Sequence, residues 1–321
     1  MKKYKFIDLF SGIGGFHIAF ENVGAECVFA CDKDKWARQV YQANFNMPPD
    51  RLAEDITTVN PADIPDFDIL CAGFPCQSFS ILGRRKGFAD EIRGTMFFYI
   101  LEILKQRRPK AFFLENVKGL LTAQDGECFR IISESLQELG YSFNYKIVKG
   151  TDHNIPQVRQ RVFIIGFLGD TVDSTFEFAP QVPLTKTLEE IFECQTINRK
   201  IARTMVSSFT GMPPQSFRCW DYYIVDGMGR RLTAKEGKRI MGFPDSFDMS
   251  SVSNERAIRQ LGNAVIVPAI QANAEQLIKY LRKMDEKGLF SFNNLCKVVP
   301  VNDDFKTGIV NENLKLAENA A

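Results

Sequence analysis

The sequence predicts an α/β protein with a doubly wound, largely parallel sheet and a second, smaller and irregular lobe. Between residues 4 and 167, short runs rich in β-branched and aromatic residues alternate with segments whose apolar residues recur at helical spacing. This alternation is typical of a sheet covered by helices, in which ligands bind beyond the carboxyl ends of the strands. We expect strands at 4–10, 26–31, 68–72, 110–115 and 162–167, and helices at 13–23, 33–45, 95–107 and 127–139.

The pattern changes after residue 167. A stretch rich in Pro, Thr, Ser and Phe runs to about residue 226, and helical spacing returns only at 233–241 and 267–284. The sequence therefore predicts a main domain at 1–174, a small domain at 175–230, a return to the main domain at 231–284, and a weakly structured tail at 285–321.

Composition limits the classes of protein that remain. The chain has 321 residues, of which 45% are hydrophobic, enough for a sizeable core. No apolar run approaches the roughly 20 residues that span a bilayer, so we expect a soluble, cytoplasmic protein. Eight cysteines form no Cys-x-x-Cys pair and only two histidines are present, so we expect no metal site. The net charge of +1 gives no support for a polyanionic partner, although basic residues cluster locally, as at 84–86.

A glycine-rich turn follows the first predicted strand. Gly12 and Gly14 allow a ligand close to the backbone, and Asp32, at the end of the second predicted strand, can accept hydrogen bonds from ribose hydroxyls. A dinucleotide, a mononucleotide or S-adenosylmethionine fits this pattern, as does a tight turn with no ligand. The spacing lacks the third glycine of the dinucleotide fingerprint, which disfavours NAD.

Three further signals converge on the same sheet edge. Cys76 follows the strand at 68–72 on a loop where a thiolate can form, although an isolated loop cysteine is more often structural. Glu115 ends the strand at 110–115, where it could also cap a helix. Arg159 and Arg161 alternate along an extended segment and point the same way, which suits an oxyanion, a phosphate or a polarised carbonyl but also an exposed strand entry.

Together these motifs resemble the cytosine-C5 DNA methyltransferase family, of the bacterial restriction-modification type. The resemblance follows the order of the family's motifs along nearly the whole chain, which makes it far more specific than any one of them. The matching segments are Phe10-Ser-Gly-Ile-Gly-Gly15, Asp32, Asp55-Ile56, Gly73-Phe-Pro-Cys-Gln77, Arg93-Gly-Thr-Met96, Glu115-Asn-Val117, Gln157-x-Arg-x-Arg161, Arg231-Leu-Thr-x-x-Glu236 and Gly262-Asn-Ala-Val265.

The resemblance implies a Rossmann-like sheet that binds S-adenosylmethionine, and it implies roles for the catalytic residues. Cytosine C5 is a weak nucleophile until a thiolate adds to C6, and we assign that attack to Cys76. Protonated Glu115 would hydrogen-bond to N3, and Arg161 would lie at O2 with Arg159 supporting it. Which group removes the C5 proton does not follow from the sequence.

The resemblance also implies a cofactor set and a DNA set of residues. Phe10 would lie against the adenine, Asp32 at the ribose, Asp55 and Ile56 around the base, and Asn263 and Val265 near the methionine end. Because the target base lies inside the duplex, it must be flipped out, and we expect the loop at 80–88 to close over the DNA. The expected cofactor contacts are Phe10, Gly12, Gly14, Asp32, Asp55, Ile56, Met96, Asn263 and Val265, and the expected substrate contacts are Phe74, Pro75, Gln77, Ser80, Arg84 and Arg85.

The expected partner is double-stranded DNA, bound by a nucleoid-associated monomer, and a cognate endonuclease is possible. The small domain would read the target sequence. Arg218 and Gln215 are candidates for groove contacts, and Trp220, Tyr222 and Tyr223 are equally well explained as core.

Three alternatives remain open at this level. A tRNA-modifying branch of the family carries Cys-Phe-Thr in its small lobe, whereas Cys219 is followed here by Trp220 and Asp221. A catalytically silent DNA-binding homologue would keep the fold without the chemistry. A nicotinamide-dependent oxidoreductase is the most distant of the three.

Overall fold

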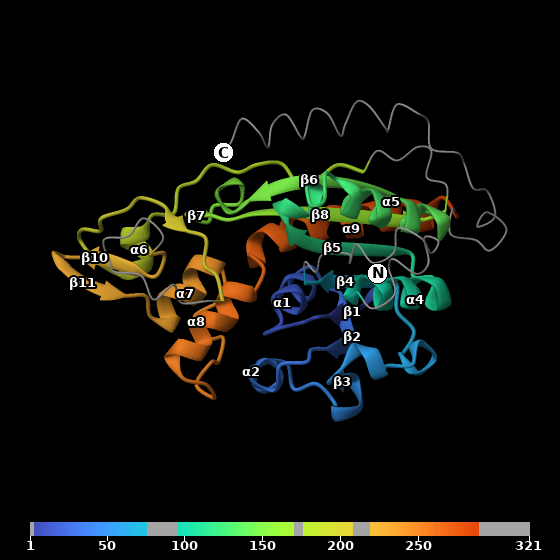
Figure 1. The fold of residues 1–321 in the computed structure, drawn as a ribbon, viewed down its shortest axis with the longest axis horizontal. Coiled ribbons are helices and arrows are strands. Elements are labelled where there is room, and N and C mark those ends of the chain that lie inside the picture. Colours follow the sequence, from blue (N-terminus) through green and yellow to red (C-terminus); the bar gives the residue numbers. More distant parts are fainter. Residues whose placement is uncertain (1–2, 76–94, 170–175, 208–218, 289–321) are drawn as a thin grey trace.

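A seven-stranded sheet forms the centre of the molecule (Figure 1). The computed structural model describes residues 3–75, 95–169, 176–207 and 219–288. The strand order is β3-β2-β1-β4-β5-β8-β6, in which β8 runs antiparallel to both of its neighbours and the other pairs are parallel. The expected doubly wound fold class is confirmed. The strands are β1 (Lys5–Leu9), β2 (Glu26–Cys31), β3 (Leu52–Ala53), β4 (Ile69–Gly73), β5 (Ala111–Val117), β6 (Tyr141–Lys149) and β8 (Gln160–Leu168).

Helices cover both faces of the sheet, so alternate strand residues, which point to opposite sides, are buried in two separate clusters. Phe6, Cys71 and Phe113 belong to one apolar cluster, together with α1 (Gly15–Asn22) and α9 (Val267–Glu286). Leu70 and Phe112 belong to the other cluster, with α4 (Met96–Arg107) and α5 (Glu127–Glu138). Helices α1 and α9 pack side by side, so the two ends of the described chain meet on one face.

The topological switch lies between β1 and β4, where the strand order reverses. Chains leaving these neighbouring strands diverge, and a ligand crevice opens between them. The helix after β2, α2 (Lys35–Phe45), begins at Asp34, whose carboxylate accepts the Trp36 N–H at 2.8 Å. This cap fixes the segment that follows β2 at the crevice.

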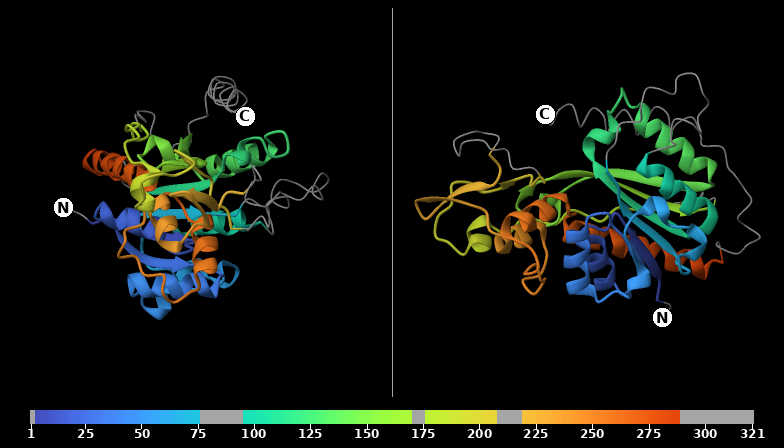
Figure 2. Two further views of the ribbon diagram at one scale, coloured as in Figure 1. Left: turned by 90° about the vertical axis from the view of Figure 1, so that its left-hand side faces the viewer. Right: turned by 60° about the horizontal axis from the view of Figure 1, so that its bottom comes forward.

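A smaller lobe lies beside the sheet, and Figures 1 and 2 show that it extends beyond the ends of the strands. The hairpin of β10 (Tyr222–Val225) and β11 (Met228–Arg231) turns at Asp226 and Gly227, both with positive φ. Helix α7 (Ala234–Met241) packs against α6 (Leu188–Phe192) and α8 (Asn254–Asn263). Strand β7 (Gln157–Val158), which directly precedes β8 in the chain, pairs with β9 (Ala202–Arg203). This short pairing links the small lobe to the central sheet. The domain bounds drawn from the sequence stay a prediction.

Several elements were not expected from the sequence. Strand β6 lies at the sheet edge, where buried Tyr141, Phe143 and Tyr145 alternate with half-buried polar residues. This alternation is the pattern of a half-buried strand, although no strand was expected here. Helix α8 is short and mostly polar, and its apolar stripe consists of Ala257, Ile258 and Leu261 alone, so it was not expected from the sequence. In the described part of the chain, no helix combines the length and the apolar character needed to cross a membrane.

Candidate active site

A cavity of about 510 Å³ lies at the carboxyl edge of the sheet, where β1, β2, β4 and β5 end. This volume falls within the roughly 300–1,000 Å³ of small-molecule sites. The wall draws on both ends of the chain, as expected from the sequence. The predicted site residues that line it are Phe10, Gly12, Asp32, Asp55, Ile56, Phe74, Pro75, Met96, Glu115, Arg159, Arg161 and Asn263.

The glycine-rich turn and the end of β2 are joined through one carboxylate. The Gly12 N–H donates to Asp32 Oδ2 at 2.7 Å, and the Asp34 N–H donates to Asp32 Oδ1 at 2.8 Å. Gly12 has a φ of +55°, which a side chain would strain. Burial raises the pKa of Asp32, and the two N–H donors oppose that shift. Each oxygen keeps further acceptor capacity, so Asp32 can receive hydroxyl donors from a ligand.

An ion pair spans the rim of this part of the cavity. Lys33 Nζ lies 3.0 Å from Asp55 Oδ2, and Thr57 donates its N–H to Asp55 Oδ1 at 3.0 Å. The Thr57 N–H and the Lys33 ammonium lower the pKa of Asp55 to about 2. Lys33 lines the cavity but was not among the expected residues. Its position directly after Asp32 could have indicated that it lies at the same site.

Gly14 and Val265 do not line the cavity. Gly14 has a φ of +89°, and a Cβ there would lie 2.2 Å from the Phe45 ring. A Cβ on Gly15 would lie 2.6 Å from Val265 Cγ2. Gly14 therefore lies where α1 packs against α2, and Val265 lies where the segment before α9 packs against α1.

Glu115 and Arg161 form a buried pair on the opposite side of the cavity. Arg161 Nε lies 2.9 Å from Glu115 Oε1, but this contact is not aligned as a hydrogen bond, so that buried oxygen has no hydrogen-bond partner among the described residues. Burial raises the pKa of Glu115, and the charges of Arg161 and then Arg159 oppose the rise. The net direction favours a protonated carboxyl that can donate a hydrogen bond.

Arg159 lines the cavity, and backbone carbonyls hold its guanidinium. Its guanidinium donates to the carbonyls of Met205 at 2.9 Å, Gly262 at 3.1 Å and Ala264 at 2.6 Å. Only 2% of the residue is exposed. Burial, followed by the charge of Arg161, lowers the pKa of Arg159, and the three carbonyls stabilise the cation. Its main contacts therefore fix the small lobe and the α8 terminus to the sheet.

Asn116 has a role that the sequence reasoning missed. Its side-chain amide donates to the Phe74 carbonyl at 3.0 Å, and its Oδ1 accepts the Val117 N–H at 2.8 Å. The amide thus holds the segment that leaves β4, two residues before Cys76 in the chain. The adjacent residue, Glu115, can be identified as a candidate from the sequence because its carboxyl group is titratable. The amide of Asn116 is not titratable and gives no such indication.

Five of the expected catalytic and substrate contacts lie outside the described part of the chain, namely Cys76, Gln77, Ser80, Arg84 and Arg85. The candidates for groove contacts, Gln215 and Arg218, lie outside it too. The described chain reaches Pro75, which lines the cavity beside Phe74. The roles assigned to these five residues remain predictions.

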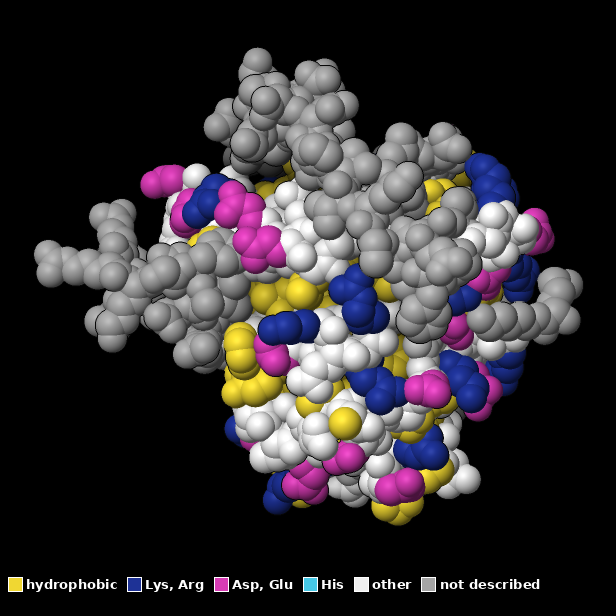
Figure 3. Space-filling view, turned by 90° about the vertical axis from the view of Figure 1, so that its right-hand side faces the viewer, with side chains coloured by type: hydrophobic (Ala, Val, Ile, Leu, Met, Phe, Trp, Pro, Cys, Tyr) yellow, Lys and Arg dark blue, Asp and Glu magenta, His cyan; other side chains and the backbone are white. Residues whose placement is uncertain are grey.

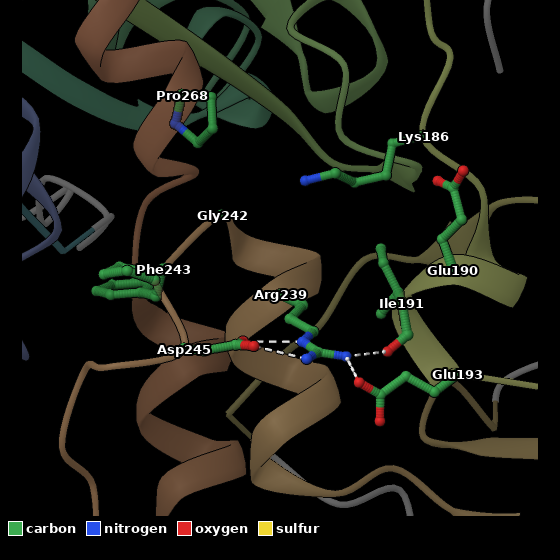
Figure 4. Close-up of a pocket in the computed structure, with 10 residues that line it drawn as sticks. Lys186, Glu190, Ile191, Glu193, Arg239, Gly242, Phe243, Asp245 and Pro268 are labelled. Atoms are coloured by element: carbon green, nitrogen blue, oxygen red, sulfur yellow. Dashed lines mark hydrogen bonds and ion pairs between the residues drawn. The ribbon is translucent and has the colours of Figure 1, made fainter.

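A second cavity, of about 520 Å³, lies between α6, α7 and the start of α9 (Figure 4). Arg239 donates to both oxygens of Asp245 and to Glu193 Oε1, at 2.6 to 2.8 Å, and to the Ile191 carbonyl at 3.2 Å. Its guanidinium is thereby neutralised by local partners. None of the predicted site residues lines this cavity.

The face of the large lobe turned away from the small lobe is shown in Figure 3. There the described Lys and Arg side chains are interspersed with Asp and Glu side chains. A polyanion is bound by a surface on which positive charge gathers. The described side chains on this face therefore form no cluster of positive charge of the kind that binds nucleic acid.

The fold and the residues at its strand ends define a Rossmann-like α/β methyltransferase. The family model described as C-5 cytosine-specific DNA methylase matches residues 4–226 and 195–279. The chain belongs to this family, and it is a DNA cytosine methyltransferase.

Curated relatives match nearly the whole chain. It is 39% identical over 316 residues to the Type II methyltransferase M.HaeII of Haemophilus aegyptius, covering 89% of this chain and 96% of that protein. It is 35% identical over 305 residues to the Type II methyltransferase M.HhaI of Haemophilus parahaemolyticus, covering 83% and 92%. Among solved structures, a mutant DNMT2 of Spodoptera frugiperda superposes with a TM-score of 0.66 at 21% identity, covering 86% of this chain and all of that one, which supports the fold alone.

Proposed function

We propose that the chain transfers a methyl group from S-adenosylmethionine to C5 of a flipped cytosine in a specific duplex sequence, through a covalent adduct between Cys76 and C6. The observation that carries this proposal is the single cavity that joins Asp32 to the Glu115–Arg161 pair. A carboxylate suited to ribose and a carboxyl suited to a pyrimidine thereby share one ligand space.

The residues present fit the cofactor. Gly12 and Asp32 are arranged for a ribose, and Phe10, Asp55 and Ile56 line the adjoining wall, where an adenine would lie. Met96 and Asn263 complete the cofactor wall. When bound, S-adenosylmethionine supplies an electrophilic sulfonium methyl group.

The nucleophile in this proposal is Cys76. A second cysteine, Cys31, lines the cavity, but burial raises its pKa to about 12, so its thiol stays protonated. Cys76 directly follows Pro75 of the cavity wall in the chain. Attack by its thiolate on C6 forms a carbon–sulfur bond, and the ring electrons move to C5, which then accepts the methyl group. Loss of the C5 proton expels the thiolate and restores the aromatic ring.

Glu115 and Arg161 stabilise the ring during that attack. Negative charge develops on N3 and O2 as sulfur adds, so a proton donor at N3 lowers the barrier. The raised pKa of Glu115 keeps its carboxyl protonated to a higher pH, which suits this role. Arg161 is the cation for O2, and Arg159, through its three carbonyls, positions the segment that carries it.

DNA binding is assigned to the segment after Cys76 and to the small lobe. Phe74, Pro75 and Gln77 would frame the flipped base, and Ser80, Arg84 and Arg85 would contact the backbone as the loop at 80–88 closes. Residues 175–230 would read the target sequence. We expect the protein to be a monomer associated with the nucleoid, and the sequence leaves open whether it has a cognate restriction endonuclease.

The decisive experiment is a covalent trap. Duplex DNA containing 5-fluorocytosine should form a denaturation-resistant complex with the protein in the presence of S-adenosylmethionine, because fluorine at C5 blocks the final elimination. Cys76→Ala should abolish the complex. Formation of the same complex by Cys76→Ala would overturn the nucleophile, and its absence from the wild type on every duplex tested would favour a catalytically silent protein.

Tritium transfer separates DNA from the tRNA alternative. Label from methyl-tritiated S-adenosylmethionine should enter duplex DNA and not tRNA. Bisulfite sequencing of DNA from expressing cells would then give the recognition sequence. Label in tRNA alone would move the chain to the RNA-modifying branch.

A further inference from the structure

Buried polar atoms without a hydrogen-bond partner among the described residues gather around the active-site cavity. Among the described residues, they include Glu115 Oε1, Arg159 Nε and both amide atoms of Gln260, and all three residues line the cavity. Such atoms are rare in native proteins, and each calls for a cause. The proposed function assigns roles to Glu115 and Arg159, whereas it assigns none to Gln260.

Gln260 stands on a rigid part of the wall. It lies in the last turn of α8, it is 7% exposed, and Gly262 and Asn263 after it also line the cavity. The backbone carbonyl of Gln260 accepts the Ala264 N–H at 3.0 Å, which ends the helix. Gln260 is therefore held at the wall by regular backbone, while the donor and the acceptor of its amide have no hydrogen-bond partner among the described residues.

Contacts across the cavity fix α8 relative to the opposite wall. One turn before Gln260, the Arg256 guanidinium lies 4.0 Å from the centre of the Trp36 ring on α2. The residue after Trp36, Ala37, lines the cavity. Helix α8, which carries Gln260, is therefore held against α2, which contributes to the wall of the same cavity.

We propose that the Gln260 amide binds the amino-acid end of the cofactor, with Nε2 donating to the α-carboxylate and Oε1 accepting from the α-ammonium. This inference rests on the proposed function. An amide whose donor and acceptor are both unused matches a zwitterion, which offers one acceptor and one donor side by side. The adenosine is assigned to Asp32 and Asp55, and the cytosine to Glu115, so the amino-acid end is the part of the ligands left for the α8 wall.

Two ligands that differ only at this end test the proposal. Calorimetry on the full chain measures the Kd of S-adenosylhomocysteine and of 5′-methylthioadenosine, which lacks the amino-acid group. Gln260→Met keeps the length and removes both polar atoms. It should weaken S-adenosylhomocysteine about 10- to 100-fold, the size expected for hydrogen bonds to charged groups, and leave 5′-methylthioadenosine within about twofold. Gln39→Met, on the exposed face of α2, is the matched control and should change neither Kd.

The melting temperature separates binding from a structural role. Removing a buried, unpaired amide should leave the Tm of the protein without ligand unchanged or higher, while affinity falls. A lower Tm with equal loss of both ligands would overturn the proposal, as would unchanged binding of S-adenosylhomocysteine or a change in DNA affinity alone. If Gln260→Met does not fold, Gln260→Glu applies the same test, since its carboxylate repels that of the ligand. Failure of the wild type to bind S-adenosylhomocysteine would instead overturn the proposed function.

Discussion

Two carboxylates stand at strand ends on opposite sides of one cavity, and their surroundings differ. Asp32, after β2, receives two backbone N–H groups at 2.7 and 2.8 Å. Glu115, at the end of β5, is 7% exposed and faces Arg161 without an aligned hydrogen bond. Burial raises the pKa of both, but only Asp32 has backbone donors that stabilise its charged form.

This difference shows how one sheet edge can hold an acceptor and a proton donor. Backbone N–H groups favour an ionised carboxylate, which accepts hydroxyls, whereas burial favours a neutral carboxyl, which donates. The proposed roles of the two residues should therefore separate in measurements that distinguish binding from turnover.

The largest effect should come from the nucleophile, which neither carboxylate can replace. Cys76→Ser should lower kcat by about 10³-fold or more, because a hydroxyl is far less ionised than a thiol. Affinity for S-adenosylhomocysteine should be retained, as measured by calorimetry. Cys194→Ser, in the small lobe, is the control and should behave as wild type. Turnover near the wild-type rate in Cys76→Ser would contradict the assignment.

Glu115→Gln should have the next largest effect. Loss of the proton donor should lower kcat by about 10²- to 10³-fold and leave the Kd of S-adenosylhomocysteine unchanged. Single-turnover methyl transfer with saturating DNA measures the chemical step directly. A loss of cofactor affinity as large as the loss of turnover would show that Glu115 also contributes to cofactor binding. The two sides of the cavity would then not have separate roles.

Asp32→Asn should show the opposite pattern. The cofactor Kd should rise about tenfold, and kcat at saturating cofactor should stay within about threefold of wild type. Asp50→Asn, on the exposed segment before β3, provides the control. A large loss of kcat with an unchanged Kd would mean that Asp32 acts in the chemistry.

Replacing Arg84 and Arg85 by Ala should leave both sides of the cavity intact and weaken DNA binding about fivefold at low salt. If each contacts one phosphate, the slope of log K against log salt should become shallower by about 1.8. Fluorescence anisotropy over a salt series measures this slope. An unchanged slope would show that these arginines do not neutralise phosphate.

The smallest effect should be on stability as a function of pH. Because the pKa of Glu115 in the folded protein is raised above its ordinary 4.5, its contribution is favourable at low pH and is lost as pH rises through the folded value. The free energy of unfolding of wild type, relative to Glu115→Gln, should therefore fall as pH rises above 4.5. Urea titrations across this range test the sign, and a rise would mean that the arginines outweigh burial.

The sequence predicted the parallel core and most of the cavity because both depend on local patterns. Apolar runs placed β1, β4 and β5, and residues directly after such strands must meet at one edge. Contacts between distant segments could not be predicted in the same way. Arg159 and Arg161 both line the cavity, but Arg159 also donates to the carbonyls of Met205, Gly262 and Ala264, which are distant in sequence.

Other features escaped because their signal arises only in the folded protein. The amide of Asn116 becomes informative through its bond to the Phe74 carbonyl, and Gln260 through the absence of a partner among the described residues. Gly14 was read as a ligand contact, yet its open side faces the Phe45 ring. A glycine motif alone does not distinguish room for a ligand from room for a neighbouring side chain.

The anchoring of Arg159 has a consequence for how new specificities can be built on this scaffold. One guanidinium fastens Met205, which lies within the proposed recognition region at 175–230, to the turn between α8 and α9. Segments inserted beyond Met205 leave this junction untouched. Exchanging the reading surface between relatives should therefore succeed when the graft begins after Met205, and fail when it removes the carbonyls that hold the arginine.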